Sequence, residues 1–140
     1  MKTLPALLFW AGMSLFVAGC SHDGGPAHAL RPTMTGTVNF KARLTLPPTA
    51  ALTVRLLDKT KADAPAVVLA ERSISNPGNP PIAFALPYPF GGITATRRYV
   101  IDARIEVEGR LQFYSMETHE VTPQNAALPH EVWVDLTKDN

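Results

Sequence analysis

The sequence lacks most of the features that stabilise or identify an exported enzyme. It contains one cysteine in 140 residues, so no disulfide can form within the chain and stability must come from a packed core. Its 13 basic and 12 acidic residues nearly balance, which argues against nucleic-acid binding and against a polybasic membrane patch. No segment shows 3.6-residue periodicity over three turns, which excludes a helical bundle.

Recognisable catalytic and metal-binding motifs are also missing. The four histidines, His22, His28, His119 and His130, have no metal-ligand spacing, and the single cysteine cannot complete a zinc site. No serine lies in a nucleophile elbow, and Asp58 and Asp63 lack the dense oxygen ligands of a calcium loop. We therefore expect no metal, no cofactor and no enzymatic activity.

The start of the chain is its most informative part. A basic beginning, Met1-Lys2, is followed by an apolar run of roughly sixteen residues, short of the ~20 that a spanning helix needs. The run closes with Val17-Ala18-Gly19-Cys20, which resembles the bacterial lipobox. That resemblance predicts a lipoprotein signal peptide over residues 1–19 and a lipid attached to Cys20 after cleavage.

Two further segments follow the predicted lipid anchor. Residues 20–33 are rich in glycine and proline and poor in large apolar side chains, which predicts a flexible tether. Residues 34–140 form the expected folded domain. Ser21 stands where an aspartate would resemble the signal that keeps lipoproteins in the inner membrane. The sequence therefore predicts an outer-membrane protein that faces the periplasm.

Alternation of apolar and polar residues predicts that the domain is all-β. Seven expected strands are separated by turn signals about every ten residues, at 38–46, 52–56, 67–74, 82–86, 99–107, 111–116 and 132–136. Glu108-Gly109 is expected to form a hairpin turn, and a helix remains an alternative for part of 67–74. The pattern is typical of a small antiparallel β-sandwich of about seven strands, with a small barrel as the neighbouring possibility.

The same alternation predicts which side chains are buried. We expect a core that includes Phe40, Val54, Phe84, Tyr99, Ile101, Phe113 and Val134. The charged residues of the same strands, Lys41, Arg43, Arg55, Arg104 and Glu106, are expected on the surface.

Three aromatic residues are the candidates for binding a partner. Tyr88 and Phe90 belong to a proline- and glycine-rich loop, where they either plug the end of the sandwich or form a binding patch. Trp133 opposes the apolar face of the last strand, so it either contacts another sheet or is an exposed anchor.

A resemblance to a known family adds to this picture. Segments such as Met34-Thr35-Gly36-Thr37-Val38, Leu46-Pro47-Pro48-Thr49-Ala50 and Leu86-Pro87-Tyr88 resemble the YbaY/YscW lipoproteins in order and spacing, from about Met34 to Met116. The resemblance implies a β-sandwich lipoprotein of the Gram-negative envelope. Some members act as pilotins, chaperones that bind an outer-membrane secretin subunit and carry it to the outer membrane. It implies no catalytic residues.

Three functions remain open from the sequence. The leading one is a non-enzymatic lipoprotein that binds an envelope protein such as a secretin in a pilotin-like role. A second is a glycan- or small-molecule-binding module, or a cryptic hydrolase, in which Trp133 and Tyr114 could stack on a sugar ring. A third is a structural envelope lipoprotein without a specific ligand.

The predicted anchor is tested by the substitution Cys20→Ser. Without the thiol no lipid can be attached, so the protein should remain unprocessed or be released into the periplasm. Metabolic labelling with a fatty acid measures this directly, and a mutant protein that still carries the label would contradict the assignment.

Overall fold

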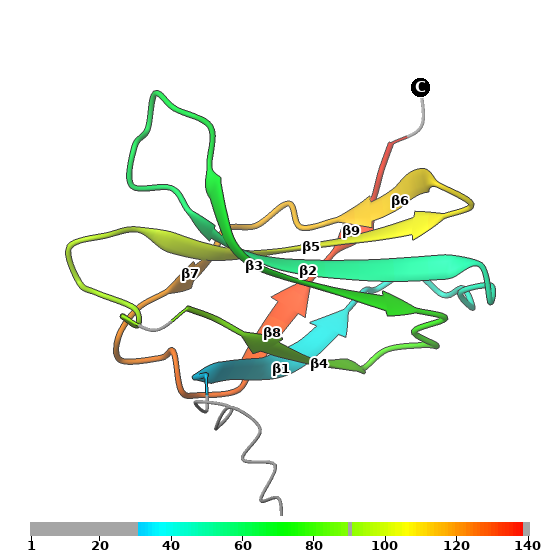
Figure 1. The fold of residues 1–140 in the computed structure, drawn as a ribbon. Coiled ribbons are helices and arrows are strands. Elements are labelled where there is room, and N and C mark those ends of the chain that lie inside the picture. The colour runs from blue at the N-terminus through cyan, green and yellow to red at the C-terminus, as the bar shows by residue number, and fades with distance from the viewer. Residues whose placement is uncertain (1–30, 90, 139–140) are drawn as a thin grey trace, which may run out of the picture.

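The computed structural model describes residues 31–89 and 91–138. These residues form nine strands in two sheets (Figure 1). In chain order they are β1 (Thr33–Asn39), β2 (Ala50–Asp58), β3 (Val67–Ser75), β4 (Ile82–Pro87), β5 (Tyr99–Val107), β6 (Arg110–Tyr114), β7 (His119–Val121), β8 (His130–Trp133) and β9 (Asp135–Leu136). This arrangement confirms the expected all-β sandwich; β7 is additional to the seven predicted strands, and the last predicted strand is divided into β8 and β9. Within the described residues no helix is long and apolar enough to span a bilayer.

The two sheets differ in width. The wider one has six strands in the order β3-β2-β5-β6-β9, with β7 also paired to β5, and the narrower one has three strands in the order β4-β1-β8 (Figure 1). β4 lies over β2 and β3, while β8 lies over β5. One pair departs from the antiparallel pattern, because β1 and β8 run parallel.

The core lies between the two sheets and follows the predicted alternation. Every apolar residue expected inside is buried, which confirms the prediction for Phe40, Val54, Phe84, Tyr99, Ile101, Phe113 and Val134. The rings of Phe40 and Phe113 pack with their centroids 4.6 Å apart. Lys41 and Arg43 are exposed, whereas Arg55, Arg104 and Glu106 are half-buried on the outer face of the wide sheet.

The first predicted strand ends seven residues earlier than the alternation indicated. β1 stops at Asn39, and residues 40–49 have no strand partner. On one side, the last pair with β4 is Val38↔Ile82, and the preceding Pro80-Pro81 lack the N–H groups that would continue the ladder. On the other side, β8 ends at Trp133 and the chain crosses to the wide sheet as β9. β1 therefore loses both neighbours at once.

Gly36 in β1 permits the close approach of its neighbours. A Cβ at this position would lie 2.1 Å from the carbonyl oxygen of His130 in β8 and 2.8 Å from the ring of Phe84 in β4. The first of these atoms belongs to the backbone, so it cannot turn aside as a flexible side chain would. The narrow sheet therefore requires glycine at this position.

A pair of histidines links the two sheets. Nε2 of His119 in β7 lies 2.9 Å from Nδ1 of His130 in β8, and His130 is buried. Burial lowers the pKa of both imidazoles, and for His130 the charge of His119 lowers the pKa further. Two neutral rings can share this hydrogen bond, whereas two imidazolium rings would set donor against donor.

Replacing Gly36 with alanine should destabilise the fold. The added methyl group must displace the backbone of β8 or the ring of Phe84, at a cost of about 1–3 kcal/mol. Chemical denaturation measures the change in the free energy of unfolding. Thr35→Ala is the matched control, because Thr35 is exposed on the same strand. Equal stability of the two variants would contradict the steric argument.

The histidine pair should make the fold less stable as the pH decreases. Since the folded pKa of each ring lies below its ordinary value of about 6.5, the unfolded chain binds more protons as pH falls through that value. Stability is therefore complete above about pH 6.5 and decreases toward pH 5, by at most ~1.4 kcal/mol per pH unit for each proton. His119→Gln should reduce the slope measured by denaturation at several pH values. An unchanged slope would show that other groups cause the dependence.

Candidate functional site

The predicted aromatic residues do not form one site. β1 begins at Thr33 beside Pro87, next to Tyr88, and ends at Asn39 beside Trp133. Six residue steps of a strand span about 20 Å. Tyr88 and Trp133 therefore lie at opposite ends of the sandwich. We call these the anchor end, where the chain enters β1, and the far end, which holds the Glu108-Gly109 hairpin.

Tyr88 is a half-buried residue of the anchor end. It packs against the core, and its amide donates a hydrogen bond to the carbonyl oxygen of Pro32. With Leu56, Ile93 and Tyr99 it lines a cavity of about 330 Å³. Tyr88 therefore closes this end of the sandwich and forms one wall of the cavity.

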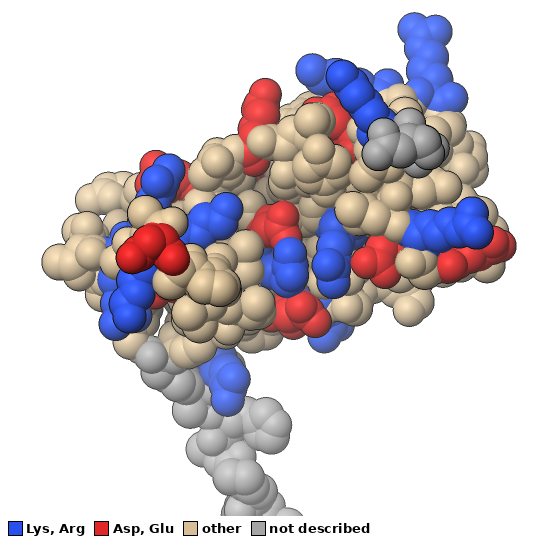
Figure 2. Space-filling view, turned by 90° about the horizontal axis from the view of Figure 1, so that it is seen from above, with Lys and Arg blue, Asp and Glu red and all other residues tan. Residues whose placement is uncertain are grey.

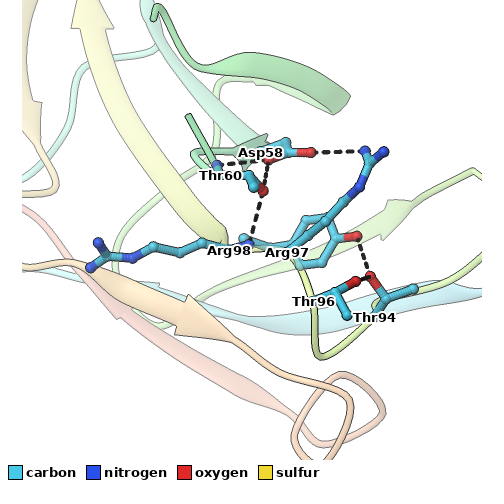
Figure 3. A network of polar contacts seen from close by, with 7 residues as sticks. Asp58, Thr60, Thr94, Thr96, Arg97 and Arg98 are labelled. Carbon is cyan, nitrogen blue, oxygen red and sulfur yellow. Dashed lines mark hydrogen bonds and ion pairs between the residues drawn. The ribbon is translucent and has the colours of Figure 1, made fainter. Parts of the chain in front are cut away.

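A polar network holds the two loops of the anchor end together (Figure 3). The carboxylate of Asp58 accepts hydrogen bonds from the amide and hydroxyl of Thr60, and it forms an ion pair with Arg97 at 3.1 Å. The hydroxyl of Thr60 in turn accepts the amide of Arg98 at 3.0 Å. The start of the 59–66 loop is thereby fixed to the end of the 88–98 loop.

The same contacts explain the electrostatics of Asp58. The hydrogen bonds from Thr60 lower the pKa of this carboxyl, and the neighbouring Arg97 lowers it further. Asp58 is thus a turn residue whose charge is already satisfied by the chain. Among the described residues, no group of three or more acidic, histidine or cysteine side chains could hold a metal ion.

An apolar groove is the main feature of the far end. It has a volume of about 530 Å³ and runs between the segment after β1 and the β6–β9 pair, lined by Lys41, Ala42, Phe113, Met116, Val134, Asp135, Leu136, Thr137 and Lys138. Two of its apolar side chains are unusually accessible for their type: Met116 is 55% exposed and Leu136 is 48% exposed. We call this feature the β6–β9 groove.

The groove results from the unequal widths of the two sheets. Leu136 pairs with Phe113, so both side chains point to the inner face of the wide sheet. On this side the narrow sheet ends with β8, which lies over β5. The irregular segment after Asn39 covers part of this region and leaves Leu136 exposed.

Basic side chains flank the β6–β9 groove. Lys41 and Lys138 line it together with one carboxylate, that of Asp135. The ammonium of Lys41 also lies 5.7 Å from the ring centroid of Trp133, which is 40% exposed. Lys41 therefore connects the groove to Trp133, a candidate partner-binding residue on the outer face of the narrow sheet.

The outer face of the wide sheet carries charges of both signs. Viewed from the side of the wide sheet, basic and acidic side chains are interspersed and form no patch of one sign (Figure 2). Arg55 and Asp102 form an ion pair across β2 and β5, and Arg104 pairs with Glu106 at 3.5 Å. Each ion pair joins one positive and one negative side chain, so these residues add no net charge that would attract a highly charged partner.

Some predicted residues lie outside the described part of the chain, and some candidates were missed. Cys20 and Phe90 are both outside it, so their roles remain predictions. The groove residues Met116 and Leu136 were not singled out from the sequence. The alternation placed Leu136 on the apolar face of the last strand but Met116 on the face opposite Phe113, and nothing local signalled that Leu136 would lack a covering sheet.

Comparisons with known proteins place this geometry in context. Residues 30–134 match the family described as "Type III secretion system lipoprotein chaperone (YscW)". The chain is 34% identical over 95 residues to the uncharacterised lipoprotein YbaY of Escherichia coli K12, a match that covers 67% of this chain and 50% of that protein. The chain thus matches only about half the length of this relative.

A solved structure is also similar. It is described as an alternative pilotin from the type II secretion system of Vibrio cholerae, and its sequence is 35% identical to this chain. The superposition has a TM-score of 0.70 and covers 76% of this chain and 97% of the other.

Proposed function

The chain belongs to the YscW family of type III secretion system lipoprotein chaperones, and from this premise we propose that it is a non-enzymatic, pilotin-like lipoprotein of the outer membrane. In this proposal Cys20 carries the lipid, residues 20–33 are the tether, and the sandwich faces the periplasm and binds a protein. The lipid supplies the location and the domain supplies the recognition surface.

The β6–β9 groove is the proposed binding site, and its exposed apolar floor is the observation that carries the proposal. Met116 and Leu136 are 55% and 48% exposed, although they line the same groove as the fully buried Phe113. Contiguous apolar surface of this kind on a soluble domain typically marks an interaction site. Trp133, linked to the groove through Lys41, provides the aromatic anchor that binding hot spots favour.

The proposed partner is an outer-membrane secretin subunit. The description of the similar solved structure as a pilotin supports this choice, as does the YscW family description. A groove of apolar side chains flanked by Lys41 and Lys138 would favour a partner segment with apolar residues and some negative charge. Binding there would keep the apolar surface of an unassembled subunit away from other chains.

Glycan binding is less well supported by the geometry. Tyr114 follows the buried Phe113 in β6, so its ring lies on the outer face of the wide sheet. Trp133 lies on the outer face of the narrow sheet. The two rings are on opposite sides of the sandwich and cannot stack on the same sugar.

The groove assignment is tested by Leu136→Glu, with Leu128→Glu as the matched control. Both leucines are about half exposed, but Leu128 lies in the loop after β7, away from the groove. A buried carboxylate at the centre of the interface should cost at least ~2 kcal/mol, which is about thirtyfold in the dissociation constant for a purified secretin subunit of the host. The control should bind like the wild type.

The same variants can be tested in cells. A strain that lacks the protein should assemble less secretin in its outer membrane, and the Leu128→Glu protein should restore assembly while the Leu136→Glu protein should not. Normal secretin assembly in the deletion strain would contradict the pilotin-like role. Normal assembly with Leu136→Glu alone would place the binding site elsewhere on the domain.

A further inference from the structure

At the anchor end of the sandwich, the start of the first strand lies beside several loops. β1 begins there at Thr33, and the loops 59–66, 88–98 and 122–129 lie there because Asp58 pairs with Tyr99 and Tyr99 pairs with Val121. The amide of Lys59 donates a hydrogen bond to the carbonyl oxygen of Arg98, which keeps two of these loops adjacent. The tether is therefore attached beside this group of loops.

Basic side chains predominate at the anchor end. The cations are Arg31, Lys59, Lys61, Arg97 and Arg98, and the acidic residues are Asp58, Asp63 and Glu120. Two of the three carboxylates are already engaged, since Asp58 pairs with Arg97 and Glu120 lies 3.4 Å from Arg98. Within the described residues Lys59 and Lys61 form no ion pair. Five cations minus three carboxylates leave this end with a formal excess of two positive charges, because Asp63 offsets only one of Arg31, Lys59 and Lys61.

Two cations of the anchor end lie beside the same surface hollow. Lys61 and Arg97 line one surface hollow of about 410 Å³ together with Thr60 and Val67. Figure 3 shows the side chains of Arg97 and Arg98 extending in different directions, and each of them pairs with a carboxylate. Val67 and Val68 beside the hollow are exposed. Cations beside accessible apolar side chains suit the interface between lipid headgroups and acyl chains.

We propose that the anchor end docks on the anionic phospholipid headgroups of the leaflet that holds the lipid anchor. This inference rests on the proposed lipidation of Cys20. It assigns Lys59 and Lys61 as the main electrostatic contacts and fixes an orientation in which the β6–β9 groove points away from the membrane toward a partner.

The length of the tether favours this end over the other. The thirteen residues Ser21–Thr33 have a root-mean-square span of roughly 20 Å if they are flexible. β5 alone has nine residues, and a strand of that length spans about 30 Å. The far end also carries cations, such as Arg43 and Arg110, but the tether would have to extend along the whole domain to bring them to the leaflet.

The orientation is measured on the full-length lipidated protein in vesicles. Cys20 would be blocked by its lipid, so an introduced cysteine provides the only reactive thiol. Ala62→Cys places a fluorophore at the anchor end and Thr45→Cys places one at the far end, and both positions are exposed. Vesicles of phosphatidylethanolamine and phosphatidylglycerol carry a nitroxide on a fraction of their headgroups, which quenches a nearby fluorophore.

We expect strong quenching at position 62 and several-fold weaker quenching at position 45. Lys59→Gln with Lys61→Gln should lower the ratio of docked to undocked domain by roughly tenfold, because each basic residue near an anionic leaflet contributes severalfold to binding. Arg43→Gln with Arg110→Gln is the matched control and should leave the ratio unchanged. Purely zwitterionic vesicles should reduce quenching as much as the double lysine variant does.

Three results would overturn the proposal. Equal quenching at both positions in protein that floats with the vesicles would exclude docking but retain the lipid anchor. Undiminished quenching at position 62 in zwitterionic vesicles would exclude anionic headgroups as the ligand. Protein that does not float with the vesicles would remove the anchor, and with it both the docking and the outer-membrane part of the proposed function.

Discussion

The architecture depends on one constraint, which is that a three-stranded sheet must cover a six-stranded one. β4 and β8 reach across β3, β2 and β5, and the apolar inner face of β6 and β9 extends beyond them. Burying apolar surface is the main force that holds such a sandwich together. The chain covers part of the excess with the irregular segment after Asn39, where Phe40 packs on Phe113. The remainder forms the β6–β9 groove.

The same constraint makes a few positions indispensable at the junction of the two sheets. The chain passes from β8 to β9 through Val134, whose amide donates a hydrogen bond to the carbonyl oxygen of Asn39, and this crossing closes one side of the sandwich. Gly36 lets β1 approach His130 and Phe84. The neutral pair of His119 and His130 then links the sheets directly. The close approach at Gly36 and the histidine pair thus both lie where the two sheets meet.

The two ends of the domain differ in a way that suits an anchored binding protein. At the anchor end, the network around Asp58 holds the loops rigid and leaves lysines outside it. At the far end, apolar side chains remain exposed along the groove. Electrostatic attraction to a membrane acts within about a Debye length, so it suits the end that lies close to the leaflet. Tight binding of a protein depends on buried apolar contacts, which suit the other end. Each end carries the chemistry appropriate to its proposed contact.

The sequence by itself determined the fold class, the core and the family, because period-two alternation records which face of a strand is buried. It placed Phe84 and Ile101 inside and Lys41 outside, and it located the Glu108-Gly109 hairpin, where both residues adopt positive φ. It did not predict the early end of β1, the parallel pairing of β1 with β8, the short strand β7, the break between β8 and β9, or the groove at Leu136. Alternation shows that a face is apolar but does not identify its covering partner. That partner is set by hydrogen bonds and packing between residues far apart in the chain, so only the tertiary structure decided which apolar surface stayed exposed.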